Sequence, residues 1–240
     1  ELYMSNCELR GWSQIFLQVK LRVVHLGGNH IHGIPPEVAT LFMLEDLRLN
    51  KNNISHVPDY ISNFKHLKIL DLSTNSIVEM DESIGDLTSL EYLHLQNNQI
   101  TSLPESLCKL SNLVDFDVSD NKIHSLPNVS NWKRLQSFCA SNNNLKQLPA
   151  GIGNLKQLEI IDLTLNHISQ LPDDFFNLEK LAFMRLKHNE IDKVSEQISQ
   201  LTDLEELNME HNALGTNGFP LHCLPALTKL THVSMNHNFP

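Results

Sequence analysis

Three histidines recur at matching places along the chain and could do metal or proton chemistry. His188, His211 and His237 are separated by 23 and 26 residues. If a repeating structure brings their imidazoles about 5 Å apart, they could share a transition metal or respond to pH. No cysteine or carboxylate completes an obvious ligand set, although Glu210 is near. The sequence therefore favours a polar column over a metal site, and we predict no metal.

Carboxylates gather in the middle of the chain at positions related by the same spacing: Asp71, Asp115, Asp117, Asp120, Glu159 and Asp162. Such a group could steer a basic partner, or it could be a solvated face that keeps the protein soluble. Carboxylates that are spaced one repeat apart and open to water are poorly placed to acquire a raised pKa. The chain also has no glycine-rich phosphate loop, H-E-x-x-H, paired CxxC or nucleophile elbow. We predict no catalytic residue, no cofactor and no enzymatic activity for this chain.

The elements that carry these residues are copies of one unit. The first half of each copy ends in L-x-x-L-x-L-x-x-N. The asparagines of successive copies follow one another at steps of 22, 23 or 26 residues: Asn29, Asn52, Asn75, Asn98, Asn121, Asn143, Asn166, Asn189, Asn212 and Asn238. Leu93 and Leu95 are two apart, which predicts a strand with one buried face. A buried asparagine at the turn that follows can satisfy backbone groups of its own repeat and the next. So regular a period predicts a solenoid with an asparagine ladder.

The signature resembles that of leucine-rich-repeat proteins, and it covers essentially the whole chain. Leu-Pro follows the asparagine in several copies, as at Leu103-Pro104 and Leu126-Pro127, which resembles the intracellular Ras-group scaffolds. The resemblance implies an α/β solenoid shaped as a curved horseshoe. Its parallel β-sheet would form the concave face, and short helices, 3₁₀ turns and loops would form the convex face.

On the concave face, the residues on either side of the inner strand leucines vary freely and form the candidate binding surface. Ten strands at about 4.8 Å spacing would make it roughly 45 Å long. Carboxylates would attract a basic partner, and aromatic residues and arginine are enriched at binding hot spots. The predicted partner-binding residues are Asp71, Tyr92, Asp115, Asp117, Asp120, Asp162, Phe183 and Arg185. Scattered apolar surface residues are the alternative interpretation.

Residues 1–240 are predicted to form a single leucine-rich-repeat domain, with a partial repeat at 1–20 and ten repeats from about 21 to 240. Cys7 takes the asparagine place in the partial repeat. The chain starts and stops inside repeats, so we expect it to be a fragment of a longer protein. The repeat after Asn212 gains three residues around 213–218, and this loop is either a tolerated insertion or an extra contact near one end.

The amino-acid composition limits which class of partner and which cellular compartment the sequence predicts. A net charge of −10 argues against nucleic acid or an anionic membrane, both of which require clustered Lys and Arg. The sequence has no stretch of about 18 apolar residues, so it predicts no membrane span. Four scattered cysteines indicate free thiols in a reducing compartment, which predicts a cytoplasmic, intracellular location.

The sequence thus predicts a non-enzymatic protein-interaction module or scaffold that binds a protein partner on its concave face. The Ras-group resemblance implies a role in intracellular signalling, with a small GTPase or a phosphatase as the partner class. Three alternatives remain open, one of which is an extracellular receptor ectodomain. The chain could be the targeting domain of a larger enzyme such as a phosphatase, cyclase, kinase or ligase, or a structural subunit of a large assembly.

Overall fold

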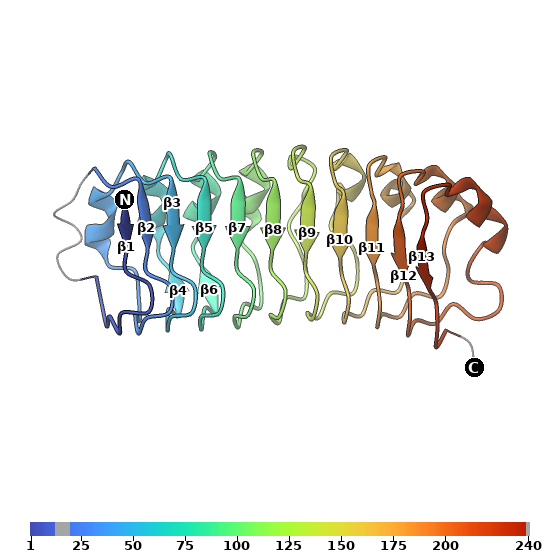
Figure 1. Ribbon diagram of the computed structural model, residues 1–240, viewed down its shortest axis with the longest axis horizontal. Coiled ribbons are helices and arrows are strands. Elements are labelled where there is room, and N and C mark those ends of the chain that lie inside the picture. Colours follow the sequence, from blue (N-terminus) through green and yellow to red (C-terminus); the bar gives the residue numbers. More distant parts are fainter. Residues whose placement is uncertain (13–19, 239–240) are drawn as a thin grey trace.

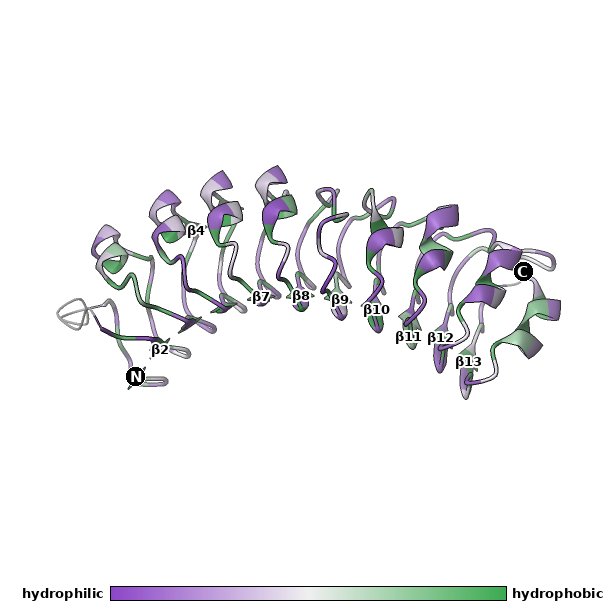
Figure 2. Cartoon of the chain, turned by 90° about the horizontal axis from the view of Figure 1, so that it is seen from above, coloured by the Kyte–Doolittle hydropathy of each residue, from purple (hydrophilic) through white to green (hydrophobic). Residues whose placement is uncertain are grey.

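The computed structural model describes residues 1–12 and 20–238, which wind into a curved solenoid with its strands on the concave side (Figures 1 and 2). An 11-stranded parallel sheet lines that side in chain order, and β4 and β6 pair with each other in a separate two-stranded sheet. The main sheet comprises β1 (Leu2–Tyr3), β2 (Val23–His25), β3 (Asp46–Arg48), β5 (Ile69–Asp71), β7 (Tyr92–His94), β8 (Asp115–Asp117), β9 (Ser137–Cys139), β10 (Ile160–Asp162), β11 (Phe183–Arg185), β12 (Glu206–Asn208) and β13 (His232–Ser234). The second contains β4 (His56–Val57) and β6 (Glu79–Met80).

Each repeat supplies one strand of the main sheet, and neighbouring strands pair without slippage. Leu93 of β7 lies beside Leu70 of β5 and Phe116 of β8. Its side chain is fully buried, whereas Tyr92 and His94 on either side are only half-buried. The alternation fixes which residues face the core and which face the concave surface. The predicted solenoid architecture is confirmed.

The asparagines form the predicted ladder, but its direction differs from the prediction. Asn98 donates from Nδ2 to the carbonyl oxygens of Leu95 at 2.9 Å and of Leu72 at 3.1 Å, and its Oδ1 accepts the Ile77 N–H at 2.9 Å. Leu72 and Ile77 belong to the preceding repeat. The expectation that each asparagine serves its own repeat and the next was therefore wrong, and each one ties its repeat to the one before it.

The outer segments form 3₁₀ helices on the convex side (Figure 2): η2 (Pro36–Thr40), η3 (Asp59–Asn63), η4 (Glu82–Asp86), η5 (Glu105–Lys109), η6 (Ile152–Asn154), η7 (Asp173–Asn177), η8 (Glu196–Gln200) and η9 (Leu221–Ala226). Proline precedes several of them and fixes the extended entry. Where Leu-Pro is replaced, a polar cap takes over. Asp81 accepts the Ser83 N–H at 2.8 Å, and Ser195 accepts the Gln197 N–H at 3.3 Å. Short 3₁₀ helices were among the predicted convex elements.

Aromatic residues fill the core of the Asn121 repeat, which is one residue shorter than its neighbours. Residues 128–135 form turns rather than a 3₁₀ helix. Trp132 is fully buried between Phe116 and Phe138, with ring centroids at 4.9 and 6.5 Å, and its indole N–H donates to the Leu107 carbonyl at 2.9 Å. One large side chain thus occupies space that a longer outer segment fills elsewhere.

One hydrophobic core runs through the described repeats. Cys7 occupies the asparagine place of its partial repeat, as predicted, and its backbone N–H donates to Asn29 Oδ1 at 2.9 Å. Within residues 1–12 and 20–238, no helix has the length and apolar character needed to span a membrane.

Candidate functional site

The candidate site is the concave face of the main sheet. Each main-sheet strand from β2 to β12 presents two half-buried side chains there, one before and one after its buried central residue. Seven of the eight predicted partner-binding residues lie in strands on this face: Asp71, Tyr92, Asp115, Asp117, Asp162, Phe183 and Arg185. The periodicity of the sequence therefore located the surface, and the structure adds the neighbours of each side chain.

The last residues of successive strands lie side by side across the sheet. We call these residues of β5 to β11 the central row: Asp71, His94, Asp117, Cys139, Asp162 and Arg185. Aspartates therefore occur on every second strand from β5 to β10. Strands spaced about 4.8 Å apart place consecutive aspartates roughly 9.6 Å apart. The central row is thus a regular array of carboxylates.

A repeated hydrogen bond orients each of these three carboxylates. The backbone N–H two residues further along donates to one oxygen: Ser73 to Asp71 at 3.0 Å, Ser119 to Asp117 at 2.9 Å and Thr164 to Asp162 at 3.0 Å. Because the partner is the rigid backbone of the same repeat, the carboxylate is held before any ligand arrives. None of the three makes an ion pair with a described residue.

Burial shifts the pKa values of side chains at the centre of this row. Desolvation raises the pKa of Asp117, and desolvation with the neighbouring Asp117 and Asp162 carboxylates raises the pKa of Cys139 to about 12. A hydrogen bond to Asp115 raises the pKa of His94. The expectation that water would keep concave carboxylates at ordinary pKa values was therefore wrong for Asp117. The Cys139 thiol stays protonated at neutral pH and is a poor nucleophile there.

Ion pairs neutralise acidic residues towards both ends of the face. In β3, the Arg48 guanidinium pairs with Asp46 at 3.0 Å. In β11, Arg185 donates twice to Glu206 of β12, at 2.9 and 3.1 Å, and lies 5.6 Å from the centroid of the Phe183 ring. Arg185 is therefore held in place and already partnered. Among the described residues, the three aspartates of the central row make no such pair. Asp115, also in the middle, does have a possible cation, because its carboxylate lies 3.6 Å from His94 Nε2.

Apolar side chains form two pairs that bracket this middle. Ile69 lies beside Tyr92 on β5 and β7, and Ile160 lies beside Phe183 on β10 and β11. Asp115 and Ser137 separate the pairs. All four apolar side chains are half-buried, so each keeps part of its surface available to a partner. Apolar contact area next to oriented carboxylates is typical of a protein-binding surface.

Asp120, the eighth predicted residue, lies outside the strands and away from this arrangement. It precedes the ladder asparagine, has a left-handed backbone (φ 55°), and its Oδ1 accepts a hydrogen bond from Asn142 Nδ2 at 2.7 Å. The same position is left-handed in every repeat, including Leu165 (φ 58°). Asn, Asp and His tolerate this conformation better than most residues. The left-handed backbone therefore helps to explain the residue types both at Asp120 and in the predicted histidine column.

The three histidines of that column stack face to face. His188 and His211, and then His211 and His237, have ring centroids 4.2 Å apart and nearly parallel planes, at 14° and 10°. Partial desolvation and the neighbouring imidazoles lower the pKa of His211. Among the described side chains, no group of three or more is placed to hold a metal ion.

Sequence reasoning missed a further column, two residues beyond each strand. Lys187 pairs with Glu210 at 2.8 Å across neighbouring repeats, and Asn236 donates to Glu210 at 2.9 Å. Continuing the two-residue alternation past the last strand residue would have identified these positions. They extend the concave face beside the histidine column.

Comparison with known families explains the repeat. A family model described as a leucine-rich repeat region matches residues 59–144 and 115–238, and a second, described as a leucine-rich repeat, matches 19–77. None of the curated proteins matches the chain.

Solved structures show similar folds. A leucine-rich-repeat protein of Leptospira interrogans is 27% identical with a TM-score of 0.86, covering 94% of this chain and 58% of its own. The plant peptide hormone receptor RGFR1, solved in complex with RGF2, is 27% identical with a TM-score of 0.84, covering 92% and 37%. The Arabidopsis thaliana receptor kinase ectodomain GASSHO1/SCHENGEN3, in complex with CASPARIAN STRIP INTEGRITY FACTOR 2, is 28% identical with a TM-score of 0.82, covering 91% and 27%. The chain thus spans less than two thirds of each of these three structures.

Proposed function

The chain belongs to the leucine-rich-repeat family, and from that premise we propose that it is a non-enzymatic interaction module that binds a basic segment of a partner protein on its concave face. The observation that carries the proposal is the central row. Asp71, Asp117 and Asp162 are oriented by backbone hydrogen bonds and make no ion pair with any described residue. Two of the similar structures are complexes in which a receptor holds a named ligand.

The spacing of the row favours one partner conformation. A polyproline II segment has three residues per turn and rises about 3.1 Å per residue, so every third side chain returns to the same side after about 9.3 Å. Aspartates on every second strand are roughly 9.6 Å apart. Lys or Arg at every third position of such a segment would meet all three carboxylates. The proposed partner is therefore a basic, extended segment that lies across the strands.

Other properties of the face support binding over catalysis. Tyr92 and Phe183 give aromatic surface on which proline rings and the aliphatic stems of Arg can pack. Cys139, the one thiol in the row, is held in its unreactive form by burial and neighbouring carboxylates. The rigid sheet loses little conformational entropy when a partner binds.

We further propose a cytoplasmic scaffold of the Ras-group type, acting in signalling with a small GTPase or phosphatase as partner. The recurring Leu-Pro after the ladder asparagine supports the subtype. The four cysteines, Cys7, Cys108, Cys139 and Cys223, are free thiols, which suits a reducing compartment. Affinity purification of the full-length protein would test the partner class, and recovery of an unrelated class alone would contradict it.

A peptide titration tests the concave site. The probe is fluorescein-labelled (Arg-Pro-Pro)₃, compared with (Glu-Pro-Pro)₃ and with a peptide of equal charge that has Arg at every second position. Fluorescence anisotropy should show at least about fivefold tighter binding of the first, a difference of about 1 kcal/mol. Added salt should weaken this binding.

Matched variants separate the site from net charge. Replacing Asp71, Asp117 and Asp162 by Asn should weaken binding of the probe about tenfold. The control replaces three exposed carboxylates of the outer turns: Glu37→Gln, Asp59→Asn and Glu105→Gln. Both variants remove three negative charges. An equal loss in the two, or no loss in the first, would contradict the proposed site.

A further inference from the structure

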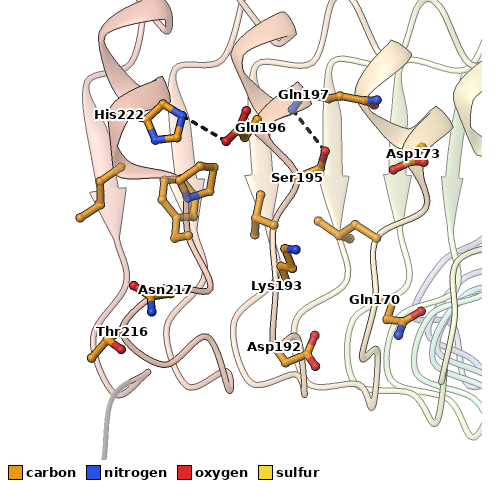
Figure 3. A pocket seen from close by; sticks show the side chains of 15 residues that line it. Gln170, Asp173, Asp192, Lys193, Ser195, Glu196, Gln197, Thr216, Asn217 and His222 are labelled. Carbon is orange, nitrogen blue, oxygen red and sulfur yellow. Dashed lines mark hydrogen bonds and ion pairs between the residues drawn. The ribbon is translucent and has the colours of Figure 1, made fainter.

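A groove of about 1050 Å³ opens on the outer side of the solenoid, away from the concave face (Figure 3). Three successive repeats line it, each with the segment that leads into its 3₁₀ helix, η7, η8 or η9. In Figure 3, His222, Glu196 and Asp173 lie along the helix side, and Asn217, Asp192 and Gln170 lie along the opposite side, with Lys193 between them. We call it the flank groove.

The insertion in the Asn212 repeat builds one wall of the flank groove. Gly218 is packed so tightly that a Cβ there would lie 1.8 Å from the Leu214 carbonyl oxygen. Its own carbonyl oxygen accepts the Val194 N–H at 2.7 Å. The three additional residues are therefore fixed against the neighbouring repeat, and the wall is formed before any ligand binds.

Two repeats line the flank groove with an apolar residue and a carboxylate two positions later, but only one of the two apolar residues is accessible. The pairs are Leu171 with Asp173 and Val194 with Glu196. The residues between them have extended backbones, Pro172 with φ −68° and ψ 154° and Ser195 with φ −69° and ψ 150°. Leu171 is half-buried and Asp173 is exposed, so this pair offers apolar contact and negative charge together. Val194 is only 3% exposed, so the second repeat offers chiefly the Glu196 carboxylate.

The third repeat adds exposed apolar surface. Leu221 lines the flank groove with 62% of its surface exposed, the largest fraction among the large apolar residues of the described chain. Contact with a partner would remove this surface from water. The exposed leucine therefore adds apolar contact area beside the preformed wall.

The charges of the flank groove are unequal. Three carboxylates line it, from Asp173, Asp192 and Glu196, against the single amine of Lys193. Glu196 contacts the exposed His222 at 3.4 Å, whereas Asp173, Asp192 and Lys193 make no ion pair with any described residue. A basic group would be attracted to the two unpaired carboxylates, and the Lys193 amine can donate to main-chain carbonyl groups of the same ligand.

We propose that the flank groove binds an extended peptide segment of a partner protein in which an apolar residue and a Lys or Arg lie two positions apart. The groove is as large as the largest small-molecule pockets and open along one side, which suits a peptide better than a metabolite. A segment lying along the flank would place its apolar residue against Leu171 or Leu221 and its basic residue against Asp173 or Asp192. This site is independent of the one proposed on the concave face.

An NMR titration tests the proposal. The ¹⁵N-labelled protein is mixed with the peptide Gly-Ser-Leu-Ser-Arg-Ser-Gly, or with Gly-Ser-Leu-Arg-Ser-Ser-Gly, in which the two side chains are adjacent, or with a Glu-for-Arg version. The first should shift backbone amides of residues 170–173, 192–197 and 216–222, and bind at least about threefold tighter than either control. Equal binding of all three peptides, or shifts confined to other regions, would overturn it.

Variants identify the residues responsible. Leu221→Ser and the double change Asp173→Asn with Asp192→Asn should each weaken binding of the first peptide at least about threefold. The matched control is Phe42→Ser, another exposed apolar residue, at 56%, outside the flank groove. It should have no effect, and neither should the Asn substitutions of the central row. If Leu221→Ser instead abolishes self-association in ultracentrifugation and leaves peptide binding intact, the occupant is a second copy and the peptide proposal fails.

Discussion

Replacing Asn98 by Ala should lower the free energy of unfolding by about 3 kcal/mol, and the lost hydrogen bonding should destabilise the preceding repeat more than its own. The Leu72 and Leu95 carbonyls each keep a second ladder partner, Asn75 Nδ2 for Leu72 and Asn121 Nδ2 for Leu95, both at 3.0 Å. The Ile77 N–H has no second acceptor and would be orphaned inside the core. An orphaned buried N–H costs about 1–3 kcal/mol, and each of the two lost carbonyl bonds about 0.5–1 kcal/mol.

Urea unfolding measures the total, and hydrogen exchange shows where it arises. A loss of about 3 kcal/mol would lower the melting temperature by roughly 6–12 °C in a chain of this size. Because Asn98 reaches backward, exchange should accelerate at Ile77 in the preceding repeat more than at Ile100 in its own. Repeat proteins can unfold in parts, so exchange is read amide by amide.

The control is Asn112→Ala. Asn112 also donates to a carbonyl, that of Thr88 at 2.8 Å, and accepts from Arg134 at 3.1 Å, but both bonds are exposed. Water can replace them, so this change should cost less than about 0.5 kcal/mol. Equal losses for Asn98→Ala and Asn112→Ala, or exchange that accelerates equally on both sides of Asn98, would refute the reasoning about the ladder.

Three further substitutions probe other parts of the structure. Burial raises the pKa of Asp117 above its unfolded value, so the native state binds more protons in that window and stability falls as pH rises through it. Asp117→Asn should therefore stabilise the protein at neutral pH and give no gain at pH about 3, by urea unfolding at both. Gly218→Ala forces a Cβ against the Leu214 carbonyl and should cost about 2 kcal/mol or more in calorimetry. Trp132→Ala leaves a cavity in the shortest repeat and should cost about 3–5 kcal/mol, a loss that a smaller measured value would contradict.

Spacing predicted the parts of the structure that the core dictates. Leu93 and Leu95 had to point inward together, so the concave position of Tyr92 and Asp117 followed from the two-residue period. The ladder direction did not follow, because an asparagine side chain can reach either neighbour. Only the three-dimensional offset between repeats decides that Asn98 reaches Leu72 and Ile77.

The residue pattern also did not reveal the local backbone conformation or the burial of individual side chains. The column that contains Asp120 and the histidines resembles a functional cluster when only side chains are considered. Its left-handed backbone accounts for part of that composition, and Leu165 shows that the position does not require a polar residue. The pKa of Asp117 is raised mainly by burial, and the strands on either side of it, β7 and β9, belong to other repeats, so no single repeat reveals the effect. Whether the predicted residues bind a partner stays a prediction that the peptide titration decides.

The two proposed surfaces can operate separately because they use different positions of the same repeat. The central row uses the last strand residue, as at Asp162, whereas the flank groove uses residues after the ladder asparagine, as at Leu171 and Asp173. Between them, Asn166 binds the Leu145 N–H and the Ala140 carbonyl of the preceding repeat, at 3.0 and 2.9 Å. This layer fixes the spacing of both surfaces. A partner that contacts one repeat on the concave side and another that contacts its flank therefore meet the same rigid framework, and substitutions at one surface leave the geometry of the other unchanged.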